Sequence, residues 1–283
     1  MKKILITGST GFIGSNLVHE LKSNFEVVVL LRKKNVYLKK ILKKKNIIIY
    51  KNNLDLNKKL SKLRIDIVIH CATHYIKKHN ISDINKLAES NIVYGNIILE
   101  NLRFMKVKKF INFTTVWENF NGIKNSPYNL YAFYKKSFSE LIKLYNLKNR
   151  YIKFYNLSIA DTFGFNDNRN KIITVLKKNY KRNKLTKIIS NKLNINLLNV
   201  KDISRAIVII IKNNFNSSTY NLYGNNFNIC KLINNFNLNN KKKIKVRYLS
   251  NNKIKEKIYF YNKLKKWKPE FSTTKEIFKI IKS

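Results

Sequence analysis

Three glycines near the N-terminus constrain the fold of this chain more than any other feature. Gly8, Gly11 and Gly14 stand in the segment ITGSTGFIGS, after a short apolar run at residues 3–7 and before a helical pattern. The chain has only seven glycines, so this cluster marks a requirement of the backbone. Glycine allows a tight turn and close approach to a phosphate, and the N-terminus of the following helix favours negative charge. The segment therefore predicts a strand–turn–helix unit that binds a pyrophosphate.

The first half of the chain alternates short apolar runs with helical patterns. Runs rich in β-branched residues occupy 27–31, 47–50, 65–70 and 110–114, and helical patterns fill 84–103 and 128–145. Helices between successive strands imply parallel strands joined by crossovers. We therefore expect an α/β fold built on a doubly wound parallel sheet.

The second half of the chain has a looser pattern. We expect strands at 151–160, 193–200 and 219–222, helices at 171–180 and 203–212, and a C-terminal helix with Ser272 as its N-cap. Residues 1–160 are expected to form a dinucleotide-binding domain, and residues 161–283 a smaller substrate-binding lobe. A segment at about 193–213 is expected to return to the main sheet.

The composition is strongly basic, with 58 Lys and Arg against 15 Asp and Glu, a net charge of +43. Such a charge favours a nucleic-acid partner. The lysines are spread along the chain, however, and Asn and Ile are also abundant, so we interpret the charge as a bias of composition and expect no nucleic-acid partner.

Two cysteines, Cys71 and Cys230, indicate no disulfide framework, and no apolar run is long enough to span a membrane. We expect a cytoplasmic protein.

The residues at the end of the second apolar run indicate whether the dinucleotide is NAD or NADP. An acidic residue there binds the ribose 2′-hydroxyl of NAD, whereas an arginine accommodates the 2′-phosphate of NADP. The segment reads VVVLLRKKN and has no acid. Because arginine is scarce in this chain, Arg32 is the informative residue, and we expect NADP, with NAD as the alternative.

The chain resembles the extended short-chain dehydrogenase/reductases, in particular the NAD-dependent epimerase/dehydratase family that acts on nucleotide sugars. ITGSTGFIG matches the family's phosphate loop, IDIVIHCAT its fourth strand, KKFINFTTVW its fifth, and NLYAFYKKSF its YxxxK helix, all in the family's order. ADTFGFNDNRNKII resembles the loop after the sixth strand. Among subfamilies the chain is most similar to the CDP-abequose synthase type, reductases of a 4-keto-dideoxy sugar nucleotide. The resemblance implies a Rossmann fold and a homodimer formed through the helices at 84–103 and 128–145.

The resemblance also implies a set of site residues. The catalytic residues are Thr115, Tyr131 and Lys135, with Thr114 as the alternative to Thr115. The substrate is held by Thr115, Asp161 and Arg169, with Lys171 as an alternative to Arg169 for the nucleotide phosphates. The cofactor is held by Gly8, Gly11, Phe12, Ile13, Gly14, Arg32, Asp55, Leu56, Cys71, Ala72, Thr73, Asn91, Tyr131 and Lys135.

Tyr131 and Lys135 are four residues apart, so both side chains lie on one face of a helix. A nearby ammonium favours the phenolate form of a tyrosine, which lets the phenol act as an acid and a base. Three other tyrosines, Tyr180, Tyr259 and Tyr261, also have a lysine four positions later. Tyr131 differs because it follows a strand-end threonine and lies near the start of a predicted helix.

One departure from the family pattern narrows the range of possible reactions. The family's 4,6-dehydratases carry an Asp-Glu pair after the catalytic threonine, whereas Val116 and Trp117 stand here. This argues against dehydration and favours a nucleotide-sugar 4-ketoreductase. The alternatives are a 4-epimerase that retains NAD and, outside enzymes, a protein of this fold that binds RNA. His70, Cys71 and His74 match no common zinc spacing, so we expect no metal site.

Overall fold

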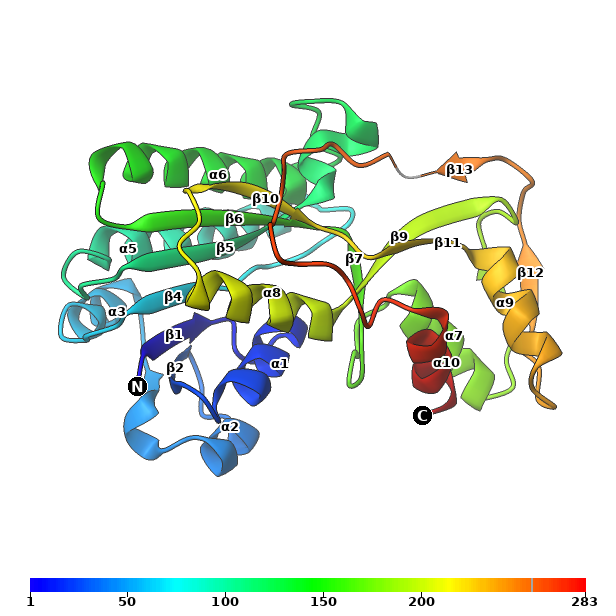
Figure 1. Cartoon of the computed structure of the whole chain (residues 1–283), viewed down its shortest axis with the longest axis horizontal. Coiled ribbons are helices and arrows are strands. Elements are labelled where there is room, and N and C mark those ends of the chain that lie inside the picture. The colour runs from blue at the N-terminus through cyan, green and yellow to red at the C-terminus, as the bar shows by residue number, and fades with distance from the viewer. Residues whose placement is uncertain (256) are drawn as a thin grey trace.

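The computed structural model describes residues 1–255 and 257–283, and its centre is an eight-stranded parallel sheet (Figure 1). The strand order is β14-β10-β6-β5-β4-β1-β2-β3. These strands are β1 (Lys3–Thr7), β2 (Glu26–Leu31), β3 (Ile47–Ile49), β4 (Ile67–His70), β5 (Lys109–Thr115), β6 (Lys153–Ile159), β10 (Ser218–Leu222) and β14 (Asn262–Lys263). The chain starts in the middle of the sheet and winds outward in both directions, which confirms the predicted doubly wound α/β fold.

Helices cover both faces of this sheet (Figure 1). One face carries α1 (Phe12–Leu21), α2 (Val36–Ile41) and α8 (Val200–Lys212), and the other carries α3 (Asn53–Leu60), α5 (Tyr94–Asn101) and α6 (Leu130–Lys148). Successive residues of a strand point to opposite faces. Ile4 and Ile6 therefore enter the core beneath α1, whereas Leu5 enters the core beneath α3 and α5.

A smaller group of elements lies beyond the ends of β6 and β10 (Figure 1). Its sheets are built from β7 (Asp161–Phe163), β9 (Leu193–Asn199), β11 (Asn225–Asn228) and β13 (Ile254–Lys255), and from the pair β8 (Thr186–Ile188) and β12 (Val246–Tyr248). The helices α7 (Ile172–Lys181), α9 (Ile229–Leu238) and α10 (Thr274–Lys282) complete it. They share a separate apolar core that includes Phe163, Leu176, Phe236 and Ile277.

Residues 193–213 return to the main sheet only through their helix, α8. β9 pairs with β7, β11 and β13 in the small sheet, whereas α8 packs against α1 of the main layer. The strands of the second half that join the main sheet are β10, which pairs with β6, and β14, which pairs with β10. The division into domains at residue 160 stays a prediction.

Helix ends differ from the sequence expectations at three places. The N-cap of α10 is Thr273, because its hydroxyl accepts from Glu276 N, whereas the Ser272 hydroxyl bonds the buried carboxylate of Asp202 at 2.7 Å. The helix expected at 84–103 contains α4 (Ile84–Ala88), a π-helical turn at Glu89–Val93, and α5. The helix expected at 128–145 is α6, which spans Leu130–Lys148 with Asn129 as its N-cap.

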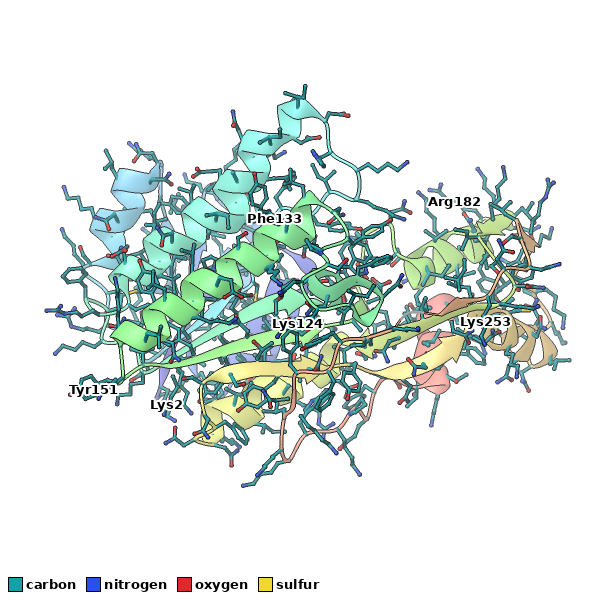
Figure 2. All side chains as sticks on the ribbon, turned by 90° about the horizontal axis from the view of Figure 1, so that it is seen from above. Lys2, Lys124, Phe133, Tyr151, Arg182 and Lys253 are labelled. Atoms are coloured by element: carbon teal, nitrogen blue, oxygen red, sulfur yellow. The ribbon has the colours of Figure 1, made fainter. Side chains whose placement is uncertain are left out.

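Basic side chains are distributed over the whole molecule. In Figure 2, Lys2, Lys124, Arg182 and Lys253 lie on well separated parts of the surface. Among the described residues, no helix has the length and apolar character that crossing a membrane requires.

Candidate active site

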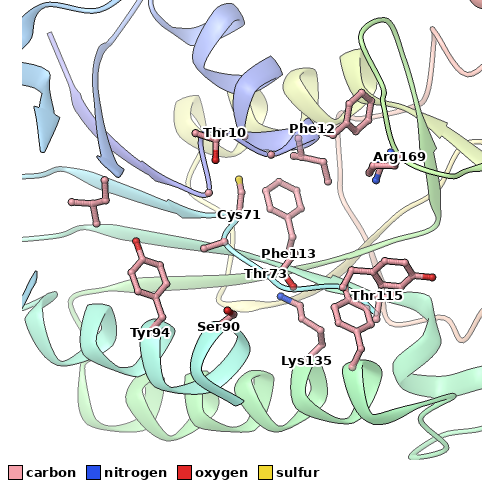
Figure 3. Close-up of a pocket in the computed structure, with 18 of the residues that line it drawn as sticks. Thr10, Phe12, Cys71, Thr73, Ser90, Tyr94, Phe113, Thr115, Lys135 and Arg169 are labelled. Carbon is pink, nitrogen blue, oxygen red and sulfur yellow. The ribbon is translucent and has the colours of Figure 1, made fainter. Parts of the chain in front are cut away.

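A cavity of about 1180 Å³ lies along the carboxyl ends of β1, β2, β4, β5 and β6 (Figure 3). This is the edge at which doubly wound sheets bind ligands. The volume exceeds that of a typical small-molecule pocket. Figure 3 shows Phe12 and Arg169 on the wall opposite Lys135, which extends from α6 toward the cavity.

The glycine loop forms the part of the cavity wall at β1 and α1, between the ends of β4 and β2. Gly8 has φ +63°, and a Cβ there would lie 2.6 Å from Ala72 N. A Cβ on Gly14 would lie 2.2 Å from the carbonyl oxygen of Gly8. The absence of side chains lets the turn pack directly on β4 and on the first turn of α1, so the N-terminus of α1 opens into the cavity. This cradle fits a pyrophosphate.

The predicted residues at the adenosine end are only partly brought together. Arg32 lines the cavity, together with Lys33, Lys34 and Asn35, which the sequence analysis did not single out. Two further predicted residues, Asp55 and Leu56, are not among the described residues that line it. Asp55 accepts from Lys51 N and from Lys59 Nζ, and Leu56 is fully buried in the core.

Asn52 and Asn53 occupy the cavity wall near the start of α3 instead. Asn52 caps α3 by accepting from Asp55 N at 2.9 Å. A capping pattern NNLD after the third strand could have drawn attention to Asn52 rather than to Asp55.

Asn91 acts through Thr73 and His74 rather than from the cavity wall. Its Oδ1 accepts from the Thr73 hydroxyl at 2.6 Å and from His74 N at 3.2 Å. Its Nδ2 donates to the carbonyl oxygens of His74 and Leu87. Asn91 is buried inside the π-helical turn, so this turn fixes the loop after β4. Thr73, with Cys71 and Ala72, lines the cavity.

His70, at the end of β4, is part of the core, whereas Cys71 follows it on the cavity wall. His70 is buried among Tyr94, Phe110 and Phe138, and its Nδ1 shares a hydrogen bond of 3.0 Å with the Thr7 hydroxyl. Burial lowers the pKa of His70 to about 3, so the ring stays neutral. Burial raises the pKa of the Cys71 thiol. In residues 1–255 and 257–283, no three His, Cys, Asp or Glu side chains gather in a possible metal site.

The three predicted catalytic residues line the same part of the cavity. Thr115 is the last residue of β5, and its hydroxyl accepts from Trp117 N at 3.3 Å. Tyr131 and Lys135 come from adjacent turns of α6. The ring of Tyr131 meets Tyr75 edge-on, with centroids 5.1 Å apart. Thr114, the alternative to Thr115, also lines the cavity.

Burial shifts the pKa values of both Tyr131 and Lys135. It raises the pKa of the Tyr131 phenol, and the nearby Thr73 hydroxyl and Arg169 only partly offset this. Burial lowers the pKa of Lys135, which nearby Glu118 raises. Tyr131 is therefore protonated at neutral pH in this structure and is available as a proton donor.

The predicted substrate residues are engaged with neighbours. Arg169 binds Asp167 through Nε at 2.7 Å and Nη2 at 2.8 Å, and its guanidinium lies 4.1 Å from the Phe12 ring centroid. Asp161 forms an ion pair of 2.5 Å with Lys171. All of these except Asp167 line the cavity.

Aromatic rings that the sequence analysis did not assign to the site form the rest of this wall. Trp117 lies 6.0 Å from Tyr75 between ring centroids, and 5.0 Å from Tyr128. The ammonium of Lys171 stands 5.2 Å from the Tyr75 ring and 5.4 Å from the Trp117 ring. Tryptophan is rare in this chain, with two in the sequence, so Trp117 beside a strand-end threonine was the available signal.

The sheet topology and the glycine cradle are typical of an enzyme of the α/β class that binds a dinucleotide. Residues 4–230 match the model of the NAD dependent epimerase/dehydratase family. The chain therefore belongs to this family, whose members are NAD(P)-dependent enzymes of nucleotide-sugar chemistry, as the sequence resemblance predicted.

The sequence identity between this chain and individual members of the family is low. The chain is 28% identical to CDP-abequose synthase of Salmonella muenchen over 226 residues, 78% of this chain and 74% of the relative. It is 37% identical to dTDP-D-glucose 4,6-dehydratase of Dictyostelium discoideum over 126 residues, which cover 41% of this chain and 29% of the relative. Among solved structures, UDP-glucuronic acid 4-epimerase of Bacillus cereus, in complex with UDP-glucuronic acid and NAD, superposes with a TM-score of 0.80 at 21% identity. That match covers 99% of both chains and confirms the fold.

Proposed function

We propose that this protein is an NADP(H)-dependent 4-ketoreductase that acts on a 4-keto-deoxy sugar linked to a nucleoside diphosphate. The observation that carries the proposal is that Thr115, Tyr131 and Lys135 line the same cavity as the glycine cradle. The similarity to a CDP-abequose synthase over 78% of this chain supports a dideoxy sugar and a CDP group.

Each catalytic side chain has a distinct role in this proposal. The nicotinamide cofactor, when bound, supplies the hydride that reaches the sugar C4. The Thr115 hydroxyl donates a hydrogen bond to the C4 ketone oxygen. Tyr131 gives its phenolic proton to that oxygen as the alcohol forms, and the ammonium of Lys135 stabilises the phenolate left behind. The high pKa of Tyr131 in this structure suits a residue that must arrive protonated.

The residues after Thr115 oppose the dehydratase reaction. Elimination of water requires an acid and a base beside the sugar C5 and C6, and Val116 and Trp117 stand in the corresponding positions. Trp117 and Tyr75 instead present aromatic rings to the cavity. An aromatic wall favours the apolar edge of a sugar that has lost hydroxyl groups.

Arg32 supports NADP as the cofactor. It lies at the end of β2 and lines the cavity beside Lys33 and Lys34. A guanidinium binds a phosphate with two parallel hydrogen bonds, and no acidic residue is present in this segment to bind a free ribose hydroxyl.

A homodimer formed through α5 and α6 belongs to the same proposal. Phe133 and Leu144 on α6 are large apolar side chains that remain exposed. A dimer that buries them is measurable as twice the monomer mass in light scattering, and a charged substitution, Phe133→Glu, is expected to weaken it.

The proposal is tested by mass spectrometry of the ligands that copurify with the protein, followed by turnover assays. We expect bound NADP, and net consumption of NADPH when a CDP-linked 4-keto-dideoxyhexose is added. Conversion of an alcohol sugar nucleotide to its 4-epimer without added NADPH would contradict the reductase and support an epimerase. Tight RNA binding without turnover of any sugar nucleotide would support the non-enzymatic alternative.

A further inference from the structure

An arginine from the smaller group of elements reaches the glycine loop of the main sheet. Arg169 belongs to the loop between β7 and α7, and it lines the cavity together with Gly11 and Phe12. Its guanidinium carbon lies 4.1 Å from the centroid of the Phe12 ring, and Figure 3 shows the two side chains next to each other. Phe12 is the first residue of α1, where backbone N–H groups have no partner within the helix. The guanidinium therefore stands beside the end of α1 that favours a pyrophosphate.

A second contact fixes the same loop against the Phe12 ring. A Cβ on Gly164 would lie 3.1 Å from Phe12 Cζ and 2.6 Å from Val200 Cγ1. The absence of a side chain at Gly164 thus lets the loop pack directly on the ring. Because Gly164 and Arg169 both contact this ring, the loop between β7 and α7 has a fixed position relative to the glycine loop.

Asp167 fixes the orientation of the guanidinium. Its carboxylate, in a side chain that is only 3% exposed, accepts from Arg169 Nε at 2.7 Å and from Nη2 at 2.8 Å. Nη2 also donates to the carbonyl oxygen of Thr162 at 3.0 Å and to its hydroxyl at 2.9 Å. The edge of the guanidinium that carries Nε and Nη2 is therefore engaged. Nη1 lies at the opposite corner, and no residue that the structure describes accepts a hydrogen bond from it.

The ion pair holds this arrangement before any ligand enters. A buried carboxylate is stable only when a cation balances it, so Asp167 retains the guanidinium in place. An arginine that is already fixed loses little side-chain freedom when it binds an anion. A guanidinium also binds phosphate oxygens through charge-assisted hydrogen bonds, which are stronger than those between neutral groups. Arg169 thus has the properties of a preformed phosphate ligand.

The other cation of this loop serves a different part of the cavity. The ammonium of Lys171 lies 5.2 Å from the Tyr75 ring, and Tyr75 in turn meets the ring of Tyr131 edge-on. Lys171 therefore stands on the wall that carries the proposed proton donor. Arg169 contacts Phe12 of the glycine loop instead, which favours the cofactor over the sugar nucleotide as its ligand.

We propose that Arg169 is a ligand of the cofactor's pyrophosphate, to which it donates from Nη1, and that Asp167 is the residue that positions it. The loop between β7 and α7 thereby completes the phosphate site that the glycine loop begins. The family resemblance implies a role for Arg169 at the substrate, so this inference moves it to the cofactor. It rests on the proposed function only in that the cavity takes a nicotinamide dinucleotide, and it is independent of the sugar.

The test is the affinity of Arg169→Gln for the cofactor, titrated by fluorescence with whichever of NADPH and NADH the wild type binds more tightly. Loss of a charge-assisted hydrogen bond to a phosphate should weaken this binding at least about tenfold. Binding of CDP to the protein saturated with cofactor, followed by calorimetry, should stay within about twofold of the wild type, because the two sites are independent. Arg182→Gln, which removes an exposed arginine at the end of α7, is the matched control and should bind the cofactor as the wild type does.

A double variant separates the role of a ligand from a purely structural role. Arg169→Gln leaves the buried carboxylate of Asp167 without its cation, which by itself disturbs the loop. Arg169→Gln combined with Asp167→Asn removes both charges and that cost. We expect the double variant to bind the cofactor as weakly as Arg169→Gln does, while its unfolding midpoint in urea returns toward that of the wild type. If Arg169→Gln does not fold, as judged by circular dichroism, the double variant takes its place in the titrations.

Three results would overturn the inference: an unchanged cofactor affinity in Arg169→Gln, a restored affinity in the double variant, or a loss of CDP affinity in place of a loss of cofactor affinity. The last result would assign Arg169 to the phosphates of the substrate. Because cofactor binding is measured without a sugar, these results are separate from the fate of the proposed function. A weakened cofactor affinity with no reduction of any sugar nucleotide would sustain Arg169 as the phosphate ligand and reject the ketoreductase.

Discussion

Gly14→Ala tests whether the glycine loop must pack directly against α1. The added Cβ would lie 2.2 Å from the Gly8 carbonyl oxygen, 2.8 Å from Gly8 C and 3.0 Å from Ser9 Cα. Non-bonded heavy atoms prefer separations near 3.5 Å, so the backbone of the turn must move by roughly 1 Å. All three obstructing atoms are backbone or Cα atoms, and no flexible side chain can rotate away.

The collision predicts a loss of stability and of NADPH affinity. Overpacking a well-packed site destabilises a protein by about 1–3 kcal/mol, and a backbone collision lies at the upper end of that range. We expect Gly14→Ala to lower the free energy of unfolding by about 3 kcal/mol in urea denaturation without cofactor. A shift of about 1 Å in the cradle should also weaken NADPH binding at least about tenfold.

Gly11→Ala is the matched control for the stability measurement. Its Cβ would meet only the Gly8 carbonyl oxygen, at 3.3 Å, and its φ of −81° suits alanine. Its free energy of unfolding should stay within about 1 kcal/mol of the wild type. Equal stability of Gly14→Ala and the wild type, with unchanged NADPH affinity, would refute the packing described for the loop.

The remaining predictions concern the proton donor, the cofactor phosphate and the C-terminal segment. Tyr131→Phe should reduce turnover by about 10²–10⁴-fold, the usual contribution of a general acid, while NADPH affinity measured by fluorescence stays within about twofold; retained activity would contradict the assigned donor. Arg32→Ala should weaken NADPH binding by about 1.5–3 kcal/mol, roughly tenfold or more, and leave NADH binding unchanged in the same titration. Equal losses for both cofactors would reject Arg32 as the phosphate ligand. Asp202→Ala should lower the free energy of unfolding by about 3–5 kcal/mol, because the fully buried carboxylate accepts from Glu270 N, Phe271 N and the Ser272 hydroxyl. An unfolding midpoint in urea equal to that of the wild type would show that Asp202 does not hold this segment in place.

The main sheet could be predicted from sequence because its signals are local. Apolar runs such as 27–31 are buried on both faces, and the glycine cluster marks the turn into α1 whatever the rest of the chain does. The YxxxK pair could be selected for the same reason, since Thr115 and Tyr131 both stand at element ends that the pattern predicts.

The features that escaped prediction depend on contacts between distant segments. Ser272 looks like an N-cap in sequence, yet its hydroxyl is taken by Asp202, 70 positions earlier, so Thr273 caps the helix. The bonds that Asp55 Oδ2 accepts from Lys59 Nζ and Lys51 N could not be read from the sequence either, and its contact with the cofactor stays a prediction. Glu118 is buried because the segment Val116–Gly122 packs against α6, which follows it in the chain.

The most direct test of the ketoreductase is the fate of the transferred hydrogen. The purified protein would be incubated with a CDP-linked 4-keto-dideoxyhexose and NADPH that carries deuterium at C4 of the nicotinamide, and the product examined by NMR and mass spectrometry. The proposed function predicts one deuterium on the sugar C4 and one NADPH oxidised for each alcohol formed. An unlabelled product formed without net oxidation of NADPH would contradict it.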